Sequence, residues 1–191
     1  MKGIKEKQDL HFPLWSNDNV FRRLFWPPRR LTKPYVREGQ TAADLGCGPG
    51  FFTLALADCV GPEGKVYAVD SDEKAVRALE AKTAKSSHRN IEARARSASD
   101  LSFIGDGSVD FILAHGLLCA MAPKDHEAAL SEMKRILKPD GLAYLSAAKG
   151  PPGHVDRAEW ERILDGFEVK RRGDGFPVFD NRWAVVSLKK R

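Results

Sequence analysis

The sequence predicts an α/β fold of three layers, in which a Rossmann-like, mostly parallel sheet has helices on both faces. After residue 40, short apolar or β-branched runs alternate with longer runs of helical period, which is typical of a parallel sheet with crossover helices. A glycine-rich turn stands between the first strand and the first helix of this series. The chain has 191 residues, 42% of them hydrophobic, so it can bury one sizeable core and is short for two.

The predicted strands are short runs that alternate in polarity or are apolar throughout. The fourth of them is almost continuously apolar, as expected of a central strand covered on both faces. The last pair is expected to form an antiparallel edge joined through the stretch GDGFPVFDN. In chain order the strands are TAADL (41–45), KVYAVD (65–70), IEARA (91–95), VDFILA (109–114), LAYLSA (142–147), and residues 167–171 and 183–188.

Helices are predicted between these strands. Residues 51–60 are apolar nearly all round and stop at Gly61-Pro62, as a buried helix with a strong terminator does. Residues 72–85 are amphipathic. The clearest helical period covers residues 129–137 and ends at the sequence KPDG, and a shorter helix is expected over 156–164. His126 and His154 are expected on the surface.

The first 40 residues have a different composition from the rest. They include Phe12, Trp15, Phe21, Phe25 and Trp26, and are too aromatic for a disordered tail. We therefore expect residues 1–40 to form a helical, aromatic cap over the ligand-binding end of the sheet. Residues 41–191 are expected to form the main domain, so that the chain is a single domain overall.

Composition excludes several classes of protein. The cysteines, Cys47, Cys59 and Cys119, are widely spaced and lack a CxxC pair, so neither a disulfide framework nor a metal site is indicated. No stretch resembles a signal peptide or a membrane span, which predicts a cytoplasmic protein. The net charge of +5 and the pI of about 9.2 raise the question of nucleic acid. The basic runs lack the interleaved aromatic residues of single-strand binders, with residues 22–26 as a partial exception.

The stretch DLGCGPG predicts a ligand site. Gly46, Gly48 and Gly50 lie between strand and helix, where missing Cβ atoms let a ligand approach the backbone. The third glycine of a dinucleotide fingerprint is replaced, and no lysine for phosphates is present in the loop. Asp70 ends the second strand, where a carboxylate can accept hydrogen bonds from a ribose diol. This combination suits a nucleoside without phosphates, and S-adenosylmethionine (SAM) is the obvious ligand.

The chain resembles the class I SAM-dependent methyltransferases over about residues 40–148. DLGCGPG is similar to their first motif, VYAVDSDE to the second, VDFILAHGLLCAM to the fourth-strand motif, and EMKRILKPDGLAYLS to the helix and strand that follow. The likeness is closest to the small-molecule branch that includes quinone and arsenite methyltransferases. It implies a seven-stranded sheet of order 3-2-1-4-5-7-6 with strand 7 antiparallel. The cofactor-binding residues that it implies are Asp44, Gly46, Cys47, Gly48, Gly50, Asp70, Ser71, Ser97, Ala98 and His115.

One departure from the family concerns adenine recognition. The family usually has Gly-Asp-Ala after the third strand, whereas this chain has Arg96-Ser97-Ala98. Either Ser97 or the nearby Asp100 could take the place of the missing aspartate. Arsenite methyltransferases need several dedicated cysteines, and Cys47 and Cys119 lie inside the shared motifs, which argues against that chemistry.

Methyl transfer from a sulfonium needs mainly an acceptor held in line. His115, at the end of the fourth strand, is the candidate catalytic residue, as a general base or by orienting the acceptor. Phe21, Phe25 and Trp26 are expected walls of the acceptor pocket, and Arg22 or Arg23 could neutralise an acidic group. A small-molecule acceptor is favoured, since no Asn-Pro-Pro-Tyr motif follows the fourth strand; RNA or protein methylation and a SAM-binding module without activity remain the alternatives.

Overall fold

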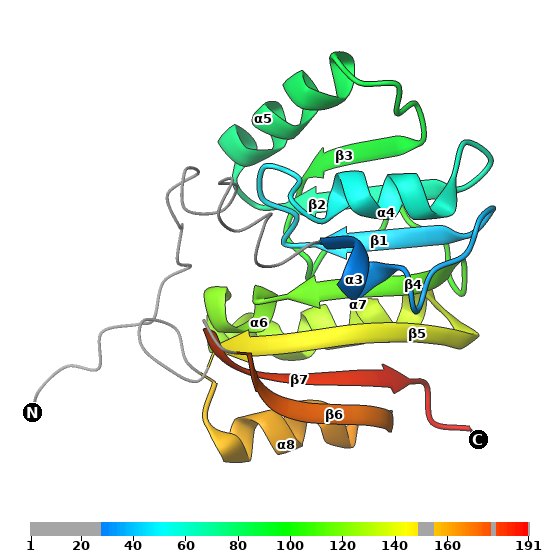
Figure 1. Cartoon of the computed structure of the whole chain (residues 1–191). Helices are drawn as coiled ribbons and strands as arrows, with labels where there is room; N and C mark the ends of the chain where they lie inside the picture. Colours follow the sequence, from blue (N-terminus) through cyan, green and yellow to red (C-terminus); the bar gives the residue numbers. More distant parts are fainter. Residues whose placement is uncertain (1–27, 149–154, 177–178, 191) are drawn as a thin grey trace, which may run out of the picture.

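The computed structural model describes residues 28–148, 155–176 and 179–190, and a seven-stranded sheet runs through these residues (Figure 1). The strand order is β3-β2-β1-β4-β5-β7-β6. Strands β1 to β5 pair in parallel, while β7 is antiparallel to both β5 and β6. The expected order and the antiparallel seventh strand are thereby confirmed.

The bounds of most elements follow the predicted ranges, and the last three strands are longer than predicted. The strands are β1 Thr41–Leu45, β2 Lys65–Asp70, β3 Ile91–Ala95, β4 Val109–His115, β5 Leu137–Ala148, β6 Glu168–Phe176 and β7 Phe179–Ser187. The helices are α3 Pro28–Thr32, α4 Thr53–Val60, α5 Glu73–Ala84, α6 Leu117–Ala120, the 3-10 turn η1 Pro123–Asp125, α7 His126–Ile136 and α8 Arg157–Asp165.

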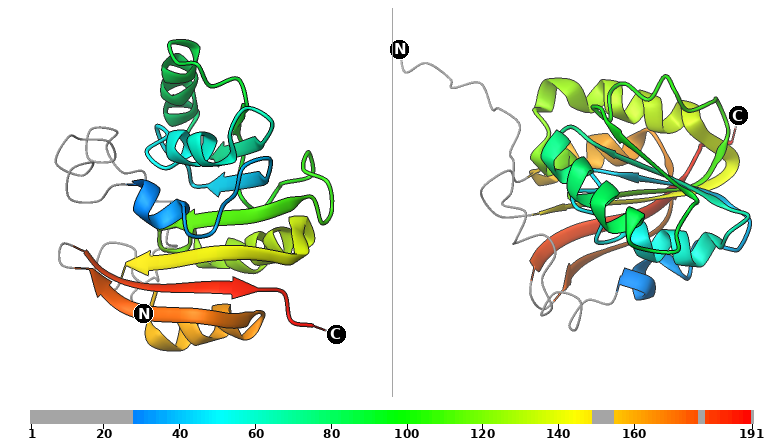
Figure 2. Two further views of the ribbon diagram at one scale, coloured as in Figure 1. Left: turned by 45° about the vertical axis from the view of Figure 1, so that its right-hand side comes forward. Right: turned by 90° about the horizontal axis from the view of Figure 1, so that it is seen from above.

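Helices cover both faces of the sheet, and α3 and α4 lie in front of it while α7 and α8 lie behind (Figure 1). The view from above separates the same layers (Figure 2). Behind the sheet, α7 and α8 bury apolar residues such as Met133 and Trp160 in the larger core cluster. In front, α4 contributes Leu56 to a second cluster, together with Val36 and Phe111. Burial of these apolar side chains is the main stabilising term for such a domain.

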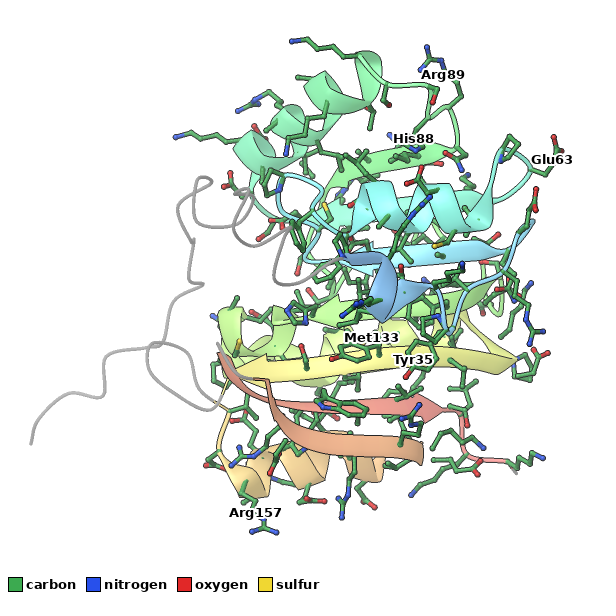
Figure 3. All side chains as sticks on the ribbon, in the orientation of Figure 1. Tyr35, Glu63, His88, Arg89, Met133 and Arg157 are labelled. Carbon is green, nitrogen blue, oxygen red and sulfur yellow. The ribbon has the colours of Figure 1, made fainter. Side chains whose placement is uncertain are left out.

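Part of the expected N-terminal cap is described, and it packs on the front face. Val36 is buried, and the ring of Tyr35 stacks on Phe111 of β4 with centroids 5.9 Å apart. Figure 3 labels Tyr35 on this side of the sheet. The cap residues Phe12, Trp15, Phe21, Phe25 and Trp26 lie outside the described residues.

Some details differ from the sequence-based expectation. Helix α4 begins at Thr53 rather than at residue 51, because the turn that contains Gly50 continues through Phe52. The short helix α6 was not expected; it follows Gly116, whose φ of 74° starts a sharp turn after β4. His126 is buried rather than exposed, since its Nδ1 lies 2.9 Å from Oε1 of Glu159 on α8. His154 lies outside the described residues.

Helix α7 ends at Ile136, close before the KPDG stretch as expected, and KPDG itself lies in the irregular start of β5. Val109 pairs with Leu137 and Phe111 pairs with Leu142, so the residues between bulge out of the ladder. Lys138 in this bulge donates to Asp110 at 2.7 Å. The last two strands are longer than predicted, because much of GDGFPVFDN continues the β6–β7 hairpin.

Candidate active site

The glycine loop after β1 is held in a conformation that glycine favours. Gly46, Gly48 and Gly50 have φ values of 77°, 52° and 89°, in the left-handed region that is costly for other residues. The N–H groups of Gly46 and Cys47 both donate to the carbonyl of Val69, at 2.8 and 3.0 Å. The loop is therefore fastened to the end of β2, at the carboxyl edge of the sheet.

Gly48 and Gly50 face different surroundings. A Cβ added at Gly48 would meet no heavy atom of the described residues within 4 Å, whereas one at Gly50 would overlap Cδ1 of Leu79 on α5. Lys82 of α5 also donates to the carbonyl of Pro49 at 2.7 Å. Gly50 thus lets the loop pack tightly on α5. Among the described residues, Gly48 leaves an open surface on which a ligand can lie against the backbone.

Asp70 anchors this loop and still has room to accept further hydrogen bonds. One carboxylate oxygen accepts from the N–H of Gly48 at 2.8 Å, and the other accepts from the N–H of Asp72 at 2.9 Å. A carboxylate has about four acceptor positions, so about two are left for other donors. Those two match a vicinal ribose diol. The structure thus places Asp70 beside the open surface of Gly48, an arrangement that fits the nucleoside part of SAM.

Asp44 lies beneath the loop. Its side chain is buried and its Oδ2 accepts a hydrogen bond of 2.6 Å from the hydroxyl of Thr53, the first residue of α4. Burial raises the pKa of Asp44 from 3.8 to about 7; the Thr53 hydrogen bond opposes this shift and Asp70 adds to it. Asp44 therefore connects β1 to the start of α4 and supports the loop from inside.

The raised pKa of Asp44 predicts a pH-dependent stability. The folded protein binds the Asp44 proton more tightly than the unfolded chain, so its free energy of unfolding falls as pH rises from about 4 to about 7. The slope approaches about 1.4 kcal/mol per pH unit within that range. Asp44→Asn keeps an acceptor for Thr53 and removes the titration. Urea unfolding at pH 5 and pH 8 should show the wild type losing stability relative to this variant at the higher pH.

Other titrating groups are common to both proteins and cancel in this comparison. A difference in unfolding free energy between wild type and Asp44→Asn that is the same at both pH values would mean that Asp44 does not titrate in this way.

Cys47 contributes its backbone, rather than its side chain, to the glycine loop. Its side chain is buried, with Sγ donating to the carbonyl of Gly48 at 3.4 Å. Burial raises the pKa of the Cys47 thiol, and the nearby Asp44 and Asp70 raise it further. The thiol is therefore protonated at neutral pH, which argues against a nucleophilic or metal-binding role.

The segment after β3 lies at the same edge. The N–H of Arg96 donates to the carbonyl of Asp70 at 3.0 Å, which brings Ser97 and Ala98 next to the end of β2. The hydroxyl of Ser97 lies 2.7 Å from that of Ser99. Ala98 is buried, while Ser71 is exposed.

Asp100, the alternative partner for adenine, already has donors within its own segment. Its carboxylate accepts from the Ser102 hydroxyl at 2.8 Å and from Arg96 at 3.3 Å. The Ser102 hydrogen bonds lower the pKa of Asp100, with a smaller contribution from Arg96. Ser97 is engaged in a similar way, because its hydroxyl also accepts from the N–H of Ser99 at 3.2 Å. An adenine role for either Ser97 or Asp100 stays a prediction.

His115 belongs to an aromatic cluster at the carboxyl end of β4. Its ring contacts Phe52 edge to face, with ring centroids 5.0 Å apart, and its centroid lies 6.3 Å from that of Tyr144 on β5. The Tyr144 ring in turn stacks on Trp183 of β7, with centroids 6.1 Å apart. Nδ1 of His115 is 2.8 Å from the hydroxyl of Ser146. Because Phe52 directly follows the glycine loop, this aromatic cluster (Phe52, His115, Tyr144 and Trp183) adjoins the predicted cofactor site.

Sequence reasoning missed several of these residues. The sequence did not identify four of them as site residues, because their partners lie on other elements and no local motif marks them: Thr53, Ser146, Tyr144 and Trp183. Other predicted site residues lie outside the described residues. They are the expected pocket walls Phe21, Phe25 and Trp26, and the expected charges Arg22 and Arg23. Within the described ranges, no group of three or more His, Cys, Asp or Glu residues could hold a metal ion.

These observations define the class of protein. The mostly parallel sheet has the order 3-2-1-4-5-7-6, with a glycine loop after β1 and a carboxylate at the end of β2. This combination is typical of Rossmann-like folds that bind a nucleoside. Residues 42–141 match a family model described as "Methyltransferase domain". The chain belongs to this family, the class I SAM-dependent methyltransferases, and its cofactor is SAM.

Named relatives agree with this assignment. The chain is 33% identical over 149 residues to a demethylmenaquinone methyltransferase of Geobacillus stearothermophilus, covering 78% of this chain and 62% of that protein. It is 36% identical over 126 residues to the enzyme of the same name from Staphylococcus carnosus, covering 66% and 50%. The chain therefore spans between half and two thirds of the length of these relatives.

A solved structure covers more of the chain. A SAM-dependent methyltransferase from Aquifex aeolicus superposes with a TM-score of 0.80 at 26% identity, covering 92% of this chain and 97% of that one. The similarity therefore extends well beyond residues 42–141, which the family model matches.

Proposed function

We propose that this protein transfers a methyl group from SAM to a planar, small-molecule acceptor of the quinol type, in the cytoplasm. The observation that carries the proposal is the aromatic cluster beside the glycine loop, in which the rings of Tyr144 and Trp183 stack with an interplanar angle of 8°. Aromatic side chains bind flat rings by stacking and edge contacts. The relatives named demethylmenaquinone methyltransferases support an acceptor of this kind.

The cofactor chemistry requires little of the protein. Bound SAM supplies a methyl group on a sulfonium, which is already a good leaving group, so the protein's contribution is mainly orientation. Asp70 would accept from the ribose hydroxyls, Gly48 would let the ligand lie on the backbone, and Ser97 would face the adenine. His115, also in the proposed cofactor set, would lie between the cofactor and the acceptor. The rest of the set would shape the loops around the cofactor: Asp44, Gly46, Cys47, Gly50, Ser71 and Ala98.

The acceptor would lie over the aromatic cluster. Burial raises the pKa of Tyr144, so its hydroxyl remains a neutral hydrogen-bonding group. We further propose that residues 1–40 close this pocket as a cap, a role supported by the packing of Val36 and Tyr35 on the front face. In the part of the chain that the structure describes, we find no helix with the length and apolar character needed to cross a bilayer.

The defining experiment uses the acceptor after which the relatives are named. Purified protein is incubated with methyl-tritiated SAM and a short-chain demethylmenaquinone in its reduced form, and label is counted in the organic extract. We expect label that depends on the acceptor and that falls sharply in Asp70→Ala. Asp72→Asn serves as the matched control, since asparagine can replace Asp72 as the N-cap of α5.

Two other functions are outcomes of the same design. RNA or protein added in place of the quinol tests the second enzyme function, which the net charge of +5 favours. Confirmed SAM binding without transfer to any of the acceptors would instead identify a SAM-binding module.

A further inference from the structure

Ser146 is a fully buried hydroxyl directly beneath His115. The two residues are cross-strand partners in the β4–β5 ladder, and Ser146 is 0% exposed. Its Oγ lies 2.8 Å from Nδ1 of His115 and 3.2 Å from the N–H of Gly116. A buried hydroxyl with two such neighbours has a restricted choice of hydrogen-bond directions.

The direction of each hydrogen bond follows from what the neighbours can do. The N–H of Gly116 only donates, so the Ser146 oxygen accepts from it. The hydroxyl hydrogen needs an acceptor because a buried donor left unsatisfied is costly. Among the described residues, Nδ1 of His115 is the acceptor that this hydroxyl meets. If Nδ1 carried the proton instead, the Ser146 hydrogen would point at no acceptor of that part of the chain.

We infer that Ser146 fixes neutral His115 as the tautomer with its proton on Nε2, and that His115 acts as a hydrogen-bond donor to an oxygen of the methyl acceptor. This inference rests on the proposed function and specifies its acceptor site. A general base would need a lone pair on Nε2, which is the opposite tautomer. His115 thus orients the acceptor, and Ser146 is a positioning residue that acts through it.

The position of the ring agrees with this role. Nδ1 is directed toward β5, so Nε2, on the other side of the ring, is directed away from Ser146. His115 is half-buried, whereas Ser146 is fully buried. A Cβ added at Gly46 would lie 3.2 Å from Leu117, two residues after His115, so the glycine loop and the histidine share one edge of the sheet. The donor therefore suits an acceptor with a phenolic or carbonyl oxygen held over Phe52 and Tyr144.

Nitrogen-15 NMR of the free protein tests the tautomer without requiring turnover. The His115 ring signals are assigned by their loss in His115→Gln. We expect a protonated Nε2 and an unprotonated Nδ1 in the wild type near neutral pH, and a redistribution of the proton between the nitrogens in Ser146→Ala. A wild-type His115 protonated on Nδ1, or a tautomer unchanged in Ser146→Ala, would overturn the inference.

Kinetics with the reduced demethylmenaquinone separate a donor from a base. A glutamine amide can donate from about the place of Nε2 but cannot remove a proton at neutral pH. We expect His115→Gln to keep kcat within about tenfold of the wild type, and His115→Ala to lose about a hundredfold, as when one preorganised donor is removed. Equal, large losses in both variants would contradict the donor role.

The two levels of the proposal fail in different ways. If the proposed function is wrong, label transfer is absent from every protein, wild type included. If only the present inference is wrong, the wild type transfers label while its His115 spectrum or the His115→Gln rate departs from the expectation.

Discussion

Asp70→Ala is expected to weaken SAM binding by about a hundredfold. The Asp70 carboxylate has about two acceptor positions left after binding the N–H groups of Gly48 and Asp72. Each hydrogen bond to a charged group is worth about 1.5 kcal/mol or more, and about 1.4 kcal/mol corresponds to a tenfold change in affinity. Loss of both ribose contacts therefore accounts for the expected change, measured by isothermal titration calorimetry.

Asp72→Asn is the matched control for this measurement. Asp72 is the neighbouring acid, and its Oδ1 accepts from the N–H of Lys74 at 2.8 Å, a cap that asparagine can also provide. SAM affinity in Asp72→Asn should stay within about threefold of the wild type, because its backbone N–H to Asp70 is retained. Circular dichroism spectra of both variants should match the wild-type spectrum if they fold normally. Equal SAM affinities of Asp70→Ala and the wild type would remove the ribose role of Asp70.

Gly48→Ala and Gly50→Ala are expected to separate binding from folding. Alanine at Gly48 takes up a left-handed conformation at a cost of about 1–2 kcal/mol and places its methyl group on the open ligand surface. Alanine at Gly50 has a comparable backbone cost and also overlaps Leu79, which is fully buried and cannot move freely. Overpacking of this kind brings the expected loss of stability for Gly50→Ala to about 3 kcal/mol.

The measured pattern should differ between the two variants. Gly48→Ala should bind SAM at least tenfold more weakly than the wild type, while its thermal unfolding midpoint falls by only about 4 °C. Gly50→Ala should lower the thermal unfolding midpoint by about 10 °C. Gly39→Ala controls for backbone strain: its φ is 79°, and its Cβ would meet none of the described atoms within 4 Å. This control should resemble Gly48→Ala in stability and the wild type in SAM affinity. Unaltered binding in Gly48→Ala would mean that the ligand does not lie on this part of the loop.

The fold was readable from the sequence because its signals are local. Each predicted strand coincides with an observed one, and the turn at Gly61-Pro62 ends α4 where expected. The start of α4 was placed two residues early, because periodicity alone does not show that the turn after Gly50 continues to Phe52. His126 was assigned to the surface because its partner, Glu159, belongs to a later helix.

The candidate site could be predicted only in part, because some of its contacts join residues that are far apart in the sequence. Asp70 and the glycines are marked by their place at the ends of a strand and a turn. The contact between His115 and Ser146 joins residues 31 positions apart, and it depends on the β4–β5 register. The stack of Tyr144 on Trp183 depends likewise on the β5–β7 pairing. No spacing within the sequence encodes such registers, since they result from how whole strands align.

The most direct test of the account is transfer of label from methyl-tritiated SAM into a cell extract that is then separated into small-molecule, RNA and protein fractions. The account predicts label in the small-molecule fraction, present with the wild type and strongly reduced with Asp70→Ala. Label found in RNA or protein instead, or no label in any fraction while SAM binding is confirmed, would contradict it.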